Sequence, residues 1–504
     1  MDKKKALLNI SVSVGFKITN IIFVILVKRF LIDYCGNEVN GLNALYLSII
    51  GFLSVAELGV GSAISFCMYK PIVEGDNNKV SALYHLLKRL YLIIGGVLLV
   101  GGLAVTPFLK ILAKDYQSAN QNLYFTFILM LISVVVTYLF SSKTSLINAY
   151  KNNYITTAIY SGGLLLQYAL QIVALLLTKS YAVYLVCRTV TGLVQWAVTE
   201  IIANKHHKGI ISNPQKVDDQ TKQQVIKNVK AMFMHKIGTV MVNTVDSVVI
   251  SAFVGIVVLG KYSNYITIMT SLSGVMGMVF SSITSVVGHL CVEADKKTVK
   301  KYFEAFQFLN FFLGFVFYLG YFEVIDNVIS ILFSADLTLS RSITFVIALD
   351  GFVKFARNNV IMFKDATGTF YNDRWRPFFE SVANLILSVI LVNVIGVSGV
   401  IVATILTNLL ICNTIEPYVL YKHALNMSPK RFYVVHYIRT LVFAGALVLV
   451  QWLMRSASNQ WTELFINGLI SVGISVVICL VILVMDYDLF KDVLAVIKKR
   501  LKKQ

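Results

Sequence analysis

Charged residues are scarce in this sequence and make up 14% of its 504 residues, whereas hydrophobic residues make up 57%. A soluble protein does not bury that much apolar surface. Stretches with almost no charge, such as 123–150 and 463–485, are long enough to cross a hydrocarbon core of about 30 Å. The composition therefore excludes an ordinary soluble protein and predicts an all-α polytopic membrane protein.

Cysteine and proline are also infrequent, with six residues of each. The cysteines are dispersed without CxxC spacing, so we infer neither a disulfide framework nor a metal site. The sequence contains no HExxH, GxSxG, P-loop or acidic-cluster motif. This argues against an enzyme and against an ATP-driven pump, and it predicts a protein with no catalytic residues, no bound metal and no cofactor.

The formal net charge is +19, which in a soluble protein would suggest a nucleic-acid partner. Here the basic residues lie mostly in short tracts between apolar runs. If the N-terminus is inside, about thirty of the 45 Lys and Arg residues fall in cytoplasmic segments, as the positive-inside rule requires. The pattern predicts no nucleic-acid partner and both termini in the cytoplasm, with the apolar run after MDKKK retained as a helix.

The apolar runs predict about fourteen transmembrane helices. They lie at 6–32, 40–68, 86–107, 123–147, 155–178, 182–203, 232–257, 262–290, 303–333, 341–363, 378–395, 397–422, 434–455 and 463–486. All six prolines then fall in loops or near helix ends, where a missing N–H is tolerated.

A weak internal repeat divides the chain into two halves. A shift of 219 residues (292 − 73) aligns VEGDNNKV at 73–80 with VEADKKTV at 292–299, and it also pairs Lys17 with Lys236. We therefore expect two six-helix lobes in parallel repeat, with an axis along the membrane normal. The expected divisions are an N-lobe at 1–203, a cytoplasmic linker at 204–231, a C-lobe at 232–422, and two further helices with a basic cytoplasmic tail at 423–504.

Lys17 is the most informative residue, because a charge within the bilayer is costly unless it meets protein or water. It lies about 16 Å into the first predicted helix, at 1.5 Å per residue. Lys17 and Asn20 share one polar stripe of that helix. Two interpretations stay open, a cavity-lining cation and a cation buried against a structural partner. Its repeat mate Lys236 lies nearer a helix end, where it could line the cavity or reach the interface.

Further ions lie within the later spans. Asp350, Lys354 and Arg357 are spaced i, i+4 and i+7, so they share one face. We expect Asp350 and Lys354 to neutralise each other and Arg357 to be left unmatched. Arg188 lies either near an interface or in a cavity. Asp246, like Asp350, is a candidate for binding a coupling proton or sodium ion, although pairing with a lysine is the alternative.

A water-filled cavity lined by such cations would attract an anion, and pyrophosphate or an acidic sugar accepts charge-assisted hydrogen bonds from Lys and Arg. The predicted cationic cavity residues are Lys17, Arg357, Lys236, Lys354 and Arg188.

Three segments carry a resemblance to a known family. KDATGTFYNDRWRPFFESVANLILSVILVNVIGVSGVIVATILTN, followed by EPYVLYK at 416–422, resembles the Wzx-like oligosaccharide flippases of the multidrug/oligosaccharidyl-lipid/polysaccharide exporter superfamily. Its most recognisable residues are Arg374, Pro377, Glu380 and Asn384. NGLNALYLSIIGFLSVAELGVGSAIS at 40–65 is similar to the second helix of that family. With fourteen helices and two lobes, the resemblance extends over nearly the whole chain.

The resemblance implies a function. Such a protein moves an undecaprenyl-pyrophosphate-linked oligosaccharide repeat unit across the bacterial cytoplasmic membrane by alternating access, for capsule or exopolysaccharide synthesis. A proton or sodium gradient or the membrane potential would supply the energy. Its partners would be the lipid-linked anionic oligosaccharide, bilayer lipids, and the polymerase and glycosyltransferases of the pathway.

The resemblance also suggests roles for particular residues. It favours Lys17, Lys236 and Arg357 as cavity cations. In related lipid flippases the last two helices form a groove for the polyprenyl tail, and the corresponding segment 434–486 is nearly uncharged, although Arg439 interrupts it. Pro377 suits a first helical turn. The motif residues Arg374, Pro377 and Glu380 are interpreted as structural or gating groups, with substrate contact as the alternative.

Three rival functions stay in view. A flippase for the peptidoglycan precursor would also carry an anion and have fourteen helices. A drug/cation antiporter of the same superfamily would need an acidic cavity and typically has twelve. A membrane glycosyltransferase or polymerase would be expected to have large extramembrane loops and a carboxylate cluster, and the sequence has neither.

Overall fold

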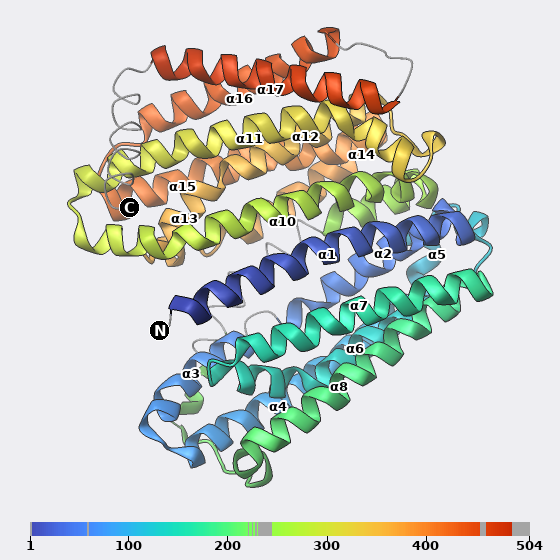
Figure 1. Ribbon diagram of the computed structural model, residues 1–504, viewed down its shortest axis with the longest axis vertical. Coiled ribbons are helices and arrows are strands. Elements are labelled where there is room, and N and C mark those ends of the chain that lie inside the picture. Colours follow the sequence, from blue (N-terminus) through green and yellow to red (C-terminus); the bar gives the residue numbers. More distant parts are fainter. Residues whose placement is uncertain are drawn as a thin grey trace. The chain divides into compact units, whose positions relative to one another are not determined.

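The computed structural model describes residues 3–57, 60–219, 221–223, 225–226, 229, 244–453 and 460–485. Throughout these ranges the secondary structure is helical and contains no strand (Figure 1). Eight of the described helices are long and apolar enough to cross a membrane. The predicted fold class, an all-α polytopic membrane protein, is confirmed.

The chain divides into two compact units, residues 1–263 and 264–504. The main helices of the first unit are α1 (Lys3–Cys35), α2 (Asn37–Leu53), α3 (Val60–Glu74), α4 (Asn77–Val105), α6 (Leu123–Ala149), α7 (Asn153–Thr178) and α8 (Tyr181–Ser212). Side-chain caps begin two of them: Asp76 accepts the Lys79 N–H before α4, and Asn122 accepts the Phe125 N–H before α6. Such caps satisfy backbone donors that the helix itself leaves free.

The second unit contains most of α10 (Ile256–Glu293), in which the division between the units falls. It continues with α11 (Lys296–Leu332), α12 (Arg341–Ala356), α13 (Asn358–Ala366), η6 (Thr369–Asp373), α14 (Arg376–Thr407), η7 (Asn408–Cys412), α15 (Asn413–Val419), η8 (Leu420–Leu425), α16 (Lys430–Leu453) and α17 (Gln460–Met485). The predicted lobe limits and the linker 204–231 stay predictions, since residues 230–243 lie outside the described ranges.

The structure breaks one predicted span and has a kink at one predicted boundary between spans. The span expected at 40–68 is broken, because α2 gives way to a 3-10 turn, η1 (Ser54–Glu57), before α3 begins. By contrast, the predicted boundary between 378–395 and 397–422 coincides with a kink inside α14 at Ile395 and Gly396. The φ of Gly396 is +60°, a value that favours glycine because it has no Cβ.

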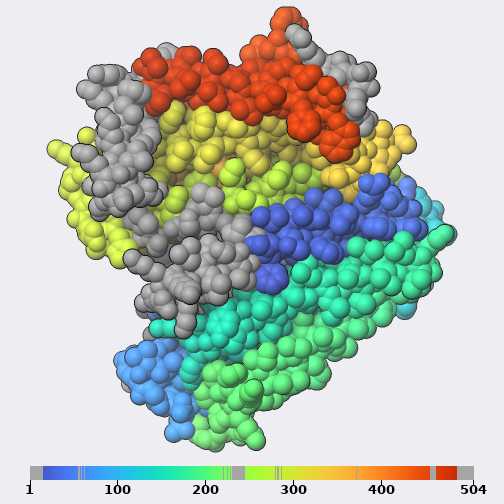
Figure 2. Space-filling model, in the orientation of Figure 1, coloured from blue at the N-terminus to red at the C-terminus, as the bar shows by residue number. Residues whose placement is uncertain are grey.

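The outer helices of the first unit present apolar side chains to their surroundings. α8 packs against both α6 and α7, and Figure 2 shows α7 and α8 side by side on the visible face of this unit. Leu177 of α7 is 79% exposed and Ile201 of α8 is 67% exposed. Apolar side chains exposed on helices of membrane-spanning length are suited to contact lipid.

Within the first unit, α2 lies very close to the start of α10. Asn37 Nδ2 donates to the carbonyl of Val257 at 2.8 Å, and Asn40 Nδ2 donates to the carbonyl of Gly260 at 3.0 Å. A Cβ placed on Gly41 would lie 2.0 Å from the carbonyl oxygen of Ile256. Glycine is therefore required here for backbone approach, as at many helix contacts in membranes.

We expect Gly41→Ala to lower the free energy of unfolding by about 1–3 kcal/mol, the usual cost of overpacking against atoms that cannot turn away. Thermal unfolding of the purified protein in detergent would measure the change. Gly162→Ala is the matched control, because a Cβ on Gly162 meets nothing within 4 Å. The control should be neutral or slightly stabilising. Equal stabilities of the two variants would contradict the close packing of α2 on α10.

The core of the second unit is rich in aromatic rings. The rings of Phe352 in α12 and Phe443 in α16 stack with centroids 3.9 Å apart, and Phe315 of α11 meets Phe443 edge-on at 5.2 Å. All three side chains are buried. This packing fixes α11, α12 and α16 against one another and gives the second unit a rigid base for its polar residues.

Candidate functional site

Six charged residues of the second unit meet at the junction of α12, α13, η6, α14 and α15. This six-ion cluster consists of Arg357, Lys364, Asp373, Arg376, Glu380 and Glu416. With three cations and three carboxylates, it is formally neutral. Five of its members lie within two of the segments that carry the family resemblance, 364–408 and 416–422, and Arg357 precedes the first of these by seven residues (364 − 357).

Glu416 is the centre of the six-ion cluster. Arg357 binds it in a bidentate manner, with Nη2–Oε1 at 2.9 Å and Nε–Oε2 at 3.0 Å. Arg376 Nη2 approaches the same Oε1 at 2.9 Å. Glu416 is 1% exposed. Bidentate arginine pairs are directional and strong, so Glu416 holds α15 to the ends of α12 and α14.

The remaining ions extend the six-ion cluster along α13 and α14. Arg376 Nη1 donates to Glu380 Oε2 at 2.6 Å, and its Nε donates to Asp373 Oδ2 at 3.1 Å. Lys364 forms an ion pair with Asp373. Buried ions such as these contribute stability only when every partner is present, because each alone carries a large desolvation cost.

The expectation that Arg357 is an unmatched cation is wrong. Arg357 is paired with Glu416 and lies 3.8 Å from a Glu380 oxygen. The pair was not predicted because Glu416 is 59 residues farther along the chain. The local expectation is confirmed, since Lys354 Nζ donates to Asp350 Oδ2 at 2.7 Å. Helical i, i+4 spacing predicts the Asp350–Lys354 pair but gives no information about the Arg357–Glu416 pair.

The structure places the family-motif residues in different settings. Pro377 is the second residue of α14, where the absence of its N–H is harmless. Glu380 belongs to the six-ion cluster. Arg374 is half-buried in the turn before α14 and is not among the six. Arg376, which the sequence places with Arg374 and Glu380 at the helix start, has the direct ion pairs, including one to Glu380 at i, i+4 spacing.

The first unit brings Arg188 close to the polar stripe of α1. Lys17 is exposed and lies more than about 20 Å from either end of α1, at 1.5 Å per residue. Asn20, one turn farther on, lies near the side chain of Tyr168 in α7. Tyr168 also interacts electrostatically with Arg188 of α8. Three neighbouring helices thus contribute to one strip, which we call the α1–α8 polar strip: Lys17, Asn20, Tyr168 and Arg188.

The other predicted ions are less informative. Lys236 lies outside the described residues. Asp246 is buried, at 7% exposure, in the helical stretch Thr244–Val254 of the first unit. Among the described residues, no group of three or more His, Cys, Asp and Glu side chains is arranged to hold a metal ion.

The long apolar helices arranged in this way define a polytopic membrane-protein fold. The chain is similar to a structure described as the lipid II flippase MurJ in an inward closed conformation, with a TM-score of 0.67, 14% identity, and coverage of 93% of this chain and 98% of that one. It is also similar to an inward-facing multidrug resistance MATE family transporter of the MOP superfamily, with a TM-score of 0.55, 13% identity, and coverage of 80% and 94%.

At these identities the likeness shows the fold. No protein-family model matches the sequence, and no curated protein matches it.

Proposed function

We propose that this protein is a flippase that moves an undecaprenyl-pyrophosphate-linked oligosaccharide repeat unit across the bacterial cytoplasmic membrane by alternating access. The observation that carries the proposal is the exposed ammonium of Lys17 in the middle of α1. A charge at that depth costs several kcal/mol in lipid, so it needs water or a counter-ion. A transported anion would supply that counter-ion.

The α1–α8 polar strip extends this argument from one residue to a surface. Arg188 adds a second cation, and it interacts electrostatically with Tyr168, which lies near Asn20 of α1. Phosphate oxygens accept charge-assisted hydrogen bonds from Lys and Arg, and hydroxyl and amide groups suit sugar hydroxyls. The strip therefore has the chemistry needed for a pyrophosphate joined to a sugar.

The second unit is proposed to contribute in two ways. The six-ion cluster holds the ends of α12 and α14 to α15, which suits a rigid element that moves as a body during alternating access. Lys354 and Lys236 remain proposed cavity cations, whereas Arg357 is proposed to act as a positioning residue through its ion pair with Glu416. Asp246 and Asp350 remain the proposed sites for a coupling proton or sodium ion.

The cellular location and the partners in this proposal are those predicted from the sequence. Both termini would lie in the cytoplasm, and the polymerase and glycosyltransferases of the pathway would supply and consume the lipid-linked repeat unit. A peptidoglycan-precursor flippase is the second candidate, because the chain has a fold similar to that of a structure described as the lipid II flippase MurJ. Both substrates are lipid-linked diphosphates, so the two functions share their recognition chemistry.

Reconstitution in proteoliposomes separates the candidates. We expect the purified full chain to move a fluorescent undecaprenyl-pyrophosphate oligosaccharide between leaflets faster than protein-free vesicles do. Lipid II and a cationic dye serve as the competing substrates. Preferential movement of lipid II would select the second candidate, whereas movement of the dye alone would show that the protein is a cation exporter.

A further inference from the structure

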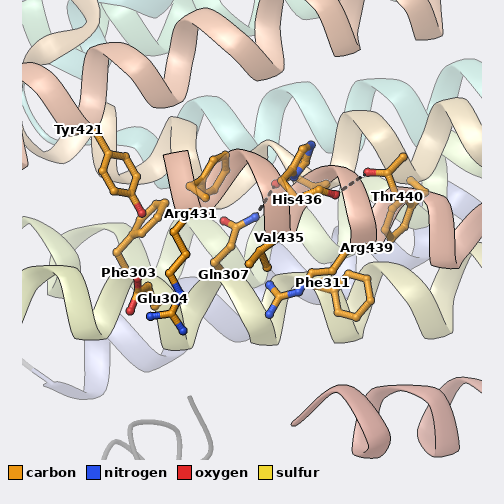
Figure 3. Close-up of a pocket in the computed structure, with 13 residues that line it drawn as sticks. Phe303, Glu304, Gln307, Phe311, Tyr421, Arg431, Val435, His436, Arg439 and Thr440 are labelled. Carbon is orange, nitrogen blue, oxygen red and sulfur yellow. Dashed lines mark hydrogen bonds between the residues drawn. The ribbon is translucent and has the colours of Figure 1, made fainter. Parts of the chain in front are cut away.

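The second unit contains a pocket between α11, α12, η8 and the first half of α16 (Figure 3). Its walls are largely aromatic, with Phe303 and Phe311 from α11, Tyr421 from η8 and Phe432 from α16. Two arginines and a histidine of α16 also line it: Arg431, His436 and Arg439. None of the residues assigned above to the transported substrate lines this pocket. The pocket therefore needs a separate explanation.

The two arginines lie on the same side of α16, eight residues and therefore about 12 Å apart along the helix axis. Arg431, the second residue of α16, is exposed, whereas Arg439 is only 9% exposed. The Arg439 guanidinium lies 5.1 Å from the ring centroid of Phe311 and 5.5 Å from that of Phe308. Aromatic faces stabilise a buried cation, which leaves an electropositive group at the inner end of the pocket.

His436 lies between the two arginines along the sequence of α16 and gives a second sign of a ligand. It is 6% exposed, its ring stacks on Phe432 at 5.5 Å, and its Nε2 has no hydrogen-bond partner. A buried polar atom without a partner costs about 1–3 kcal/mol. His436 lines the pocket, and a ligand that reached this atom would supply the missing hydrogen bond.

The charges of the pocket favour an anion. Glu304 is the one carboxylate among the lining residues, and Figure 3 shows it beside Arg431 near the start of α16. Two arginines against one carboxylate leave a net positive charge when His436 is neutral. The Gln307 amide and the Thr440 hydroxyl also line the pocket, and both are engaged with backbone carbonyls.

The surface of α16 beside the pocket suits acyl chains. Val434, Ile438 and Leu441 follow one another at i, i+4 and i+7, and they are 60%, 53% and 71% exposed. This apolar stripe borders the arginine-bearing side of the same helix. A ligand with an anionic head and an apolar tail would match both surfaces, whereas a free anion would use only the first.

We propose that this pocket is a binding site for the anionic headgroup of a bilayer phospholipid. The lipid phosphate lies between Arg431 and His436, the buried charge of Arg439 attracts it from the inner end, and the acyl chains follow the exposed stripe of α16. Since Arg431 is at the predicted cytoplasmic end of the helix, the lipid belongs to the inner leaflet. The proposal concerns a lipid that stays bound, and it does not depend on which substrate is transported.

Native mass spectrometry of the full-length protein tests this site, with phosphatidylglycerol and phosphatidylcholine as probes. We expect tighter binding of phosphatidylglycerol, and a loss of affinity of at least about tenfold in Arg431→Gln and in Arg439→Gln, since each change removes a charge-assisted interaction of about 1.5–3 kcal/mol. Arg29→Gln is the control, because Arg29 is 48% exposed in an ion pair on α1 of the first unit. It should bind as the unchanged protein does.

Arg431→Gln keeps the test decisive if Arg439→Gln fails to fold, because Arg431 is exposed. His436→Phe should also weaken binding of phosphatidylglycerol while preserving the ring stack. Equal affinity for the two phospholipids, or unchanged affinity in Arg431→Gln, would overturn the proposal. Displacement of phosphatidylglycerol by inorganic phosphate at similar concentration would identify a free-anion site instead. Displacement by a lipid-linked diphosphate alone would assign the pocket to the transported substrate.

Discussion

Glu416→Gln is expected to lower the free energy of unfolding by about 3–5 kcal/mol, the usual cost of breaking a buried ion pair. The change leaves three cations of the six-ion cluster facing two carboxylates, and Arg357 loses both of its hydrogen bonds to a carboxylate. Because Glu416 is 1% exposed, water cannot replace the lost charge. Denaturant titration in mixed detergent micelles and thermal unfolding would each report the loss.

Glu74→Gln is the matched control for this loss. Glu74 forms an i, i+4 pair with Lys70, and the two side chains are 53% and 84% exposed. Surface pairs of this kind contribute about 0–1 kcal/mol. A stability change in Glu416→Gln as small as that in Glu74→Gln would contradict the assignment of a buried, mutually dependent six-ion cluster.

A double replacement separates charge balance from packing. Arg357→Met combined with Glu416→Leu removes one cation and one carboxylate, so two ions of each sign remain. Replacing a buried ion pair with apolar residues of similar volume is often neutral or stabilising. We therefore expect the double variant to recover at least half of the stability that Glu416→Gln loses. A double variant no more stable than the single one would mean that Glu416 acts through geometry and not through charge.

The sequence predicted the local features of the fold better than the distant ones. Membrane-spanning helices are apparent in a sequence because hydrophobicity over about 20 residues is a local property. The Asp350–Lys354 pair was predictable for the same reason, since helical spacing alone brings the two together. The Arg357–Glu416 pair depends on how α12, η7 and α15 fold back, and no residue spacing encodes that.

The two helix breaks also show that local features are predicted from the sequence better than features that depend on distant contacts. The interruption near Gly396 was predictable because glycine marks a position where a positive φ is tolerated. The break at Ser54–Glu57 contains neither proline nor glycine, and the predicted span 40–68 ran through it. Its 3-10 turn therefore depends on tertiary surroundings such as the hydrogen bond from the Tyr138 hydroxyl to Glu57 at 2.8 Å.

For the candidate site too, local properties were predicted from the sequence and tertiary partners were not. Lys17 was identified from depth and helical phase, both of which are local properties. Its association with Arg188 was not predictable, because it runs through Asn20 and Tyr168 on two different helices. Arg357 was identified for the right chemical reason, as a cation in a span, yet its electrostatic partner changes its proposed role from an open cavity cation to a positioning residue.

Lys17→Ala is expected to reduce transport of the lipid-linked diphosphate by about tenfold to a hundredfold, since a charge-assisted hydrogen bond to phosphate contributes about 1.5–3 kcal/mol. Its stability should be nearly unchanged, because the Lys17 side chain is exposed. Initial rates in proteoliposomes at several substrate concentrations would show the effect mainly as weaker apparent affinity. Lys17→Arg should retain most of the activity, because it preserves the charge.

Lys70→Ala is the control for this experiment, as it removes another exposed lysine, whose partner is the surface residue Glu74. It should transport normally. Lys17→Ala and Glu416→Gln then differ in kind: the first is expected to lose affinity with normal stability, and the second to lose stability. Full activity of Lys17→Ala would remove the main support for an anionic substrate, since the exposed ammonium in mid-helix would then have no part in transport.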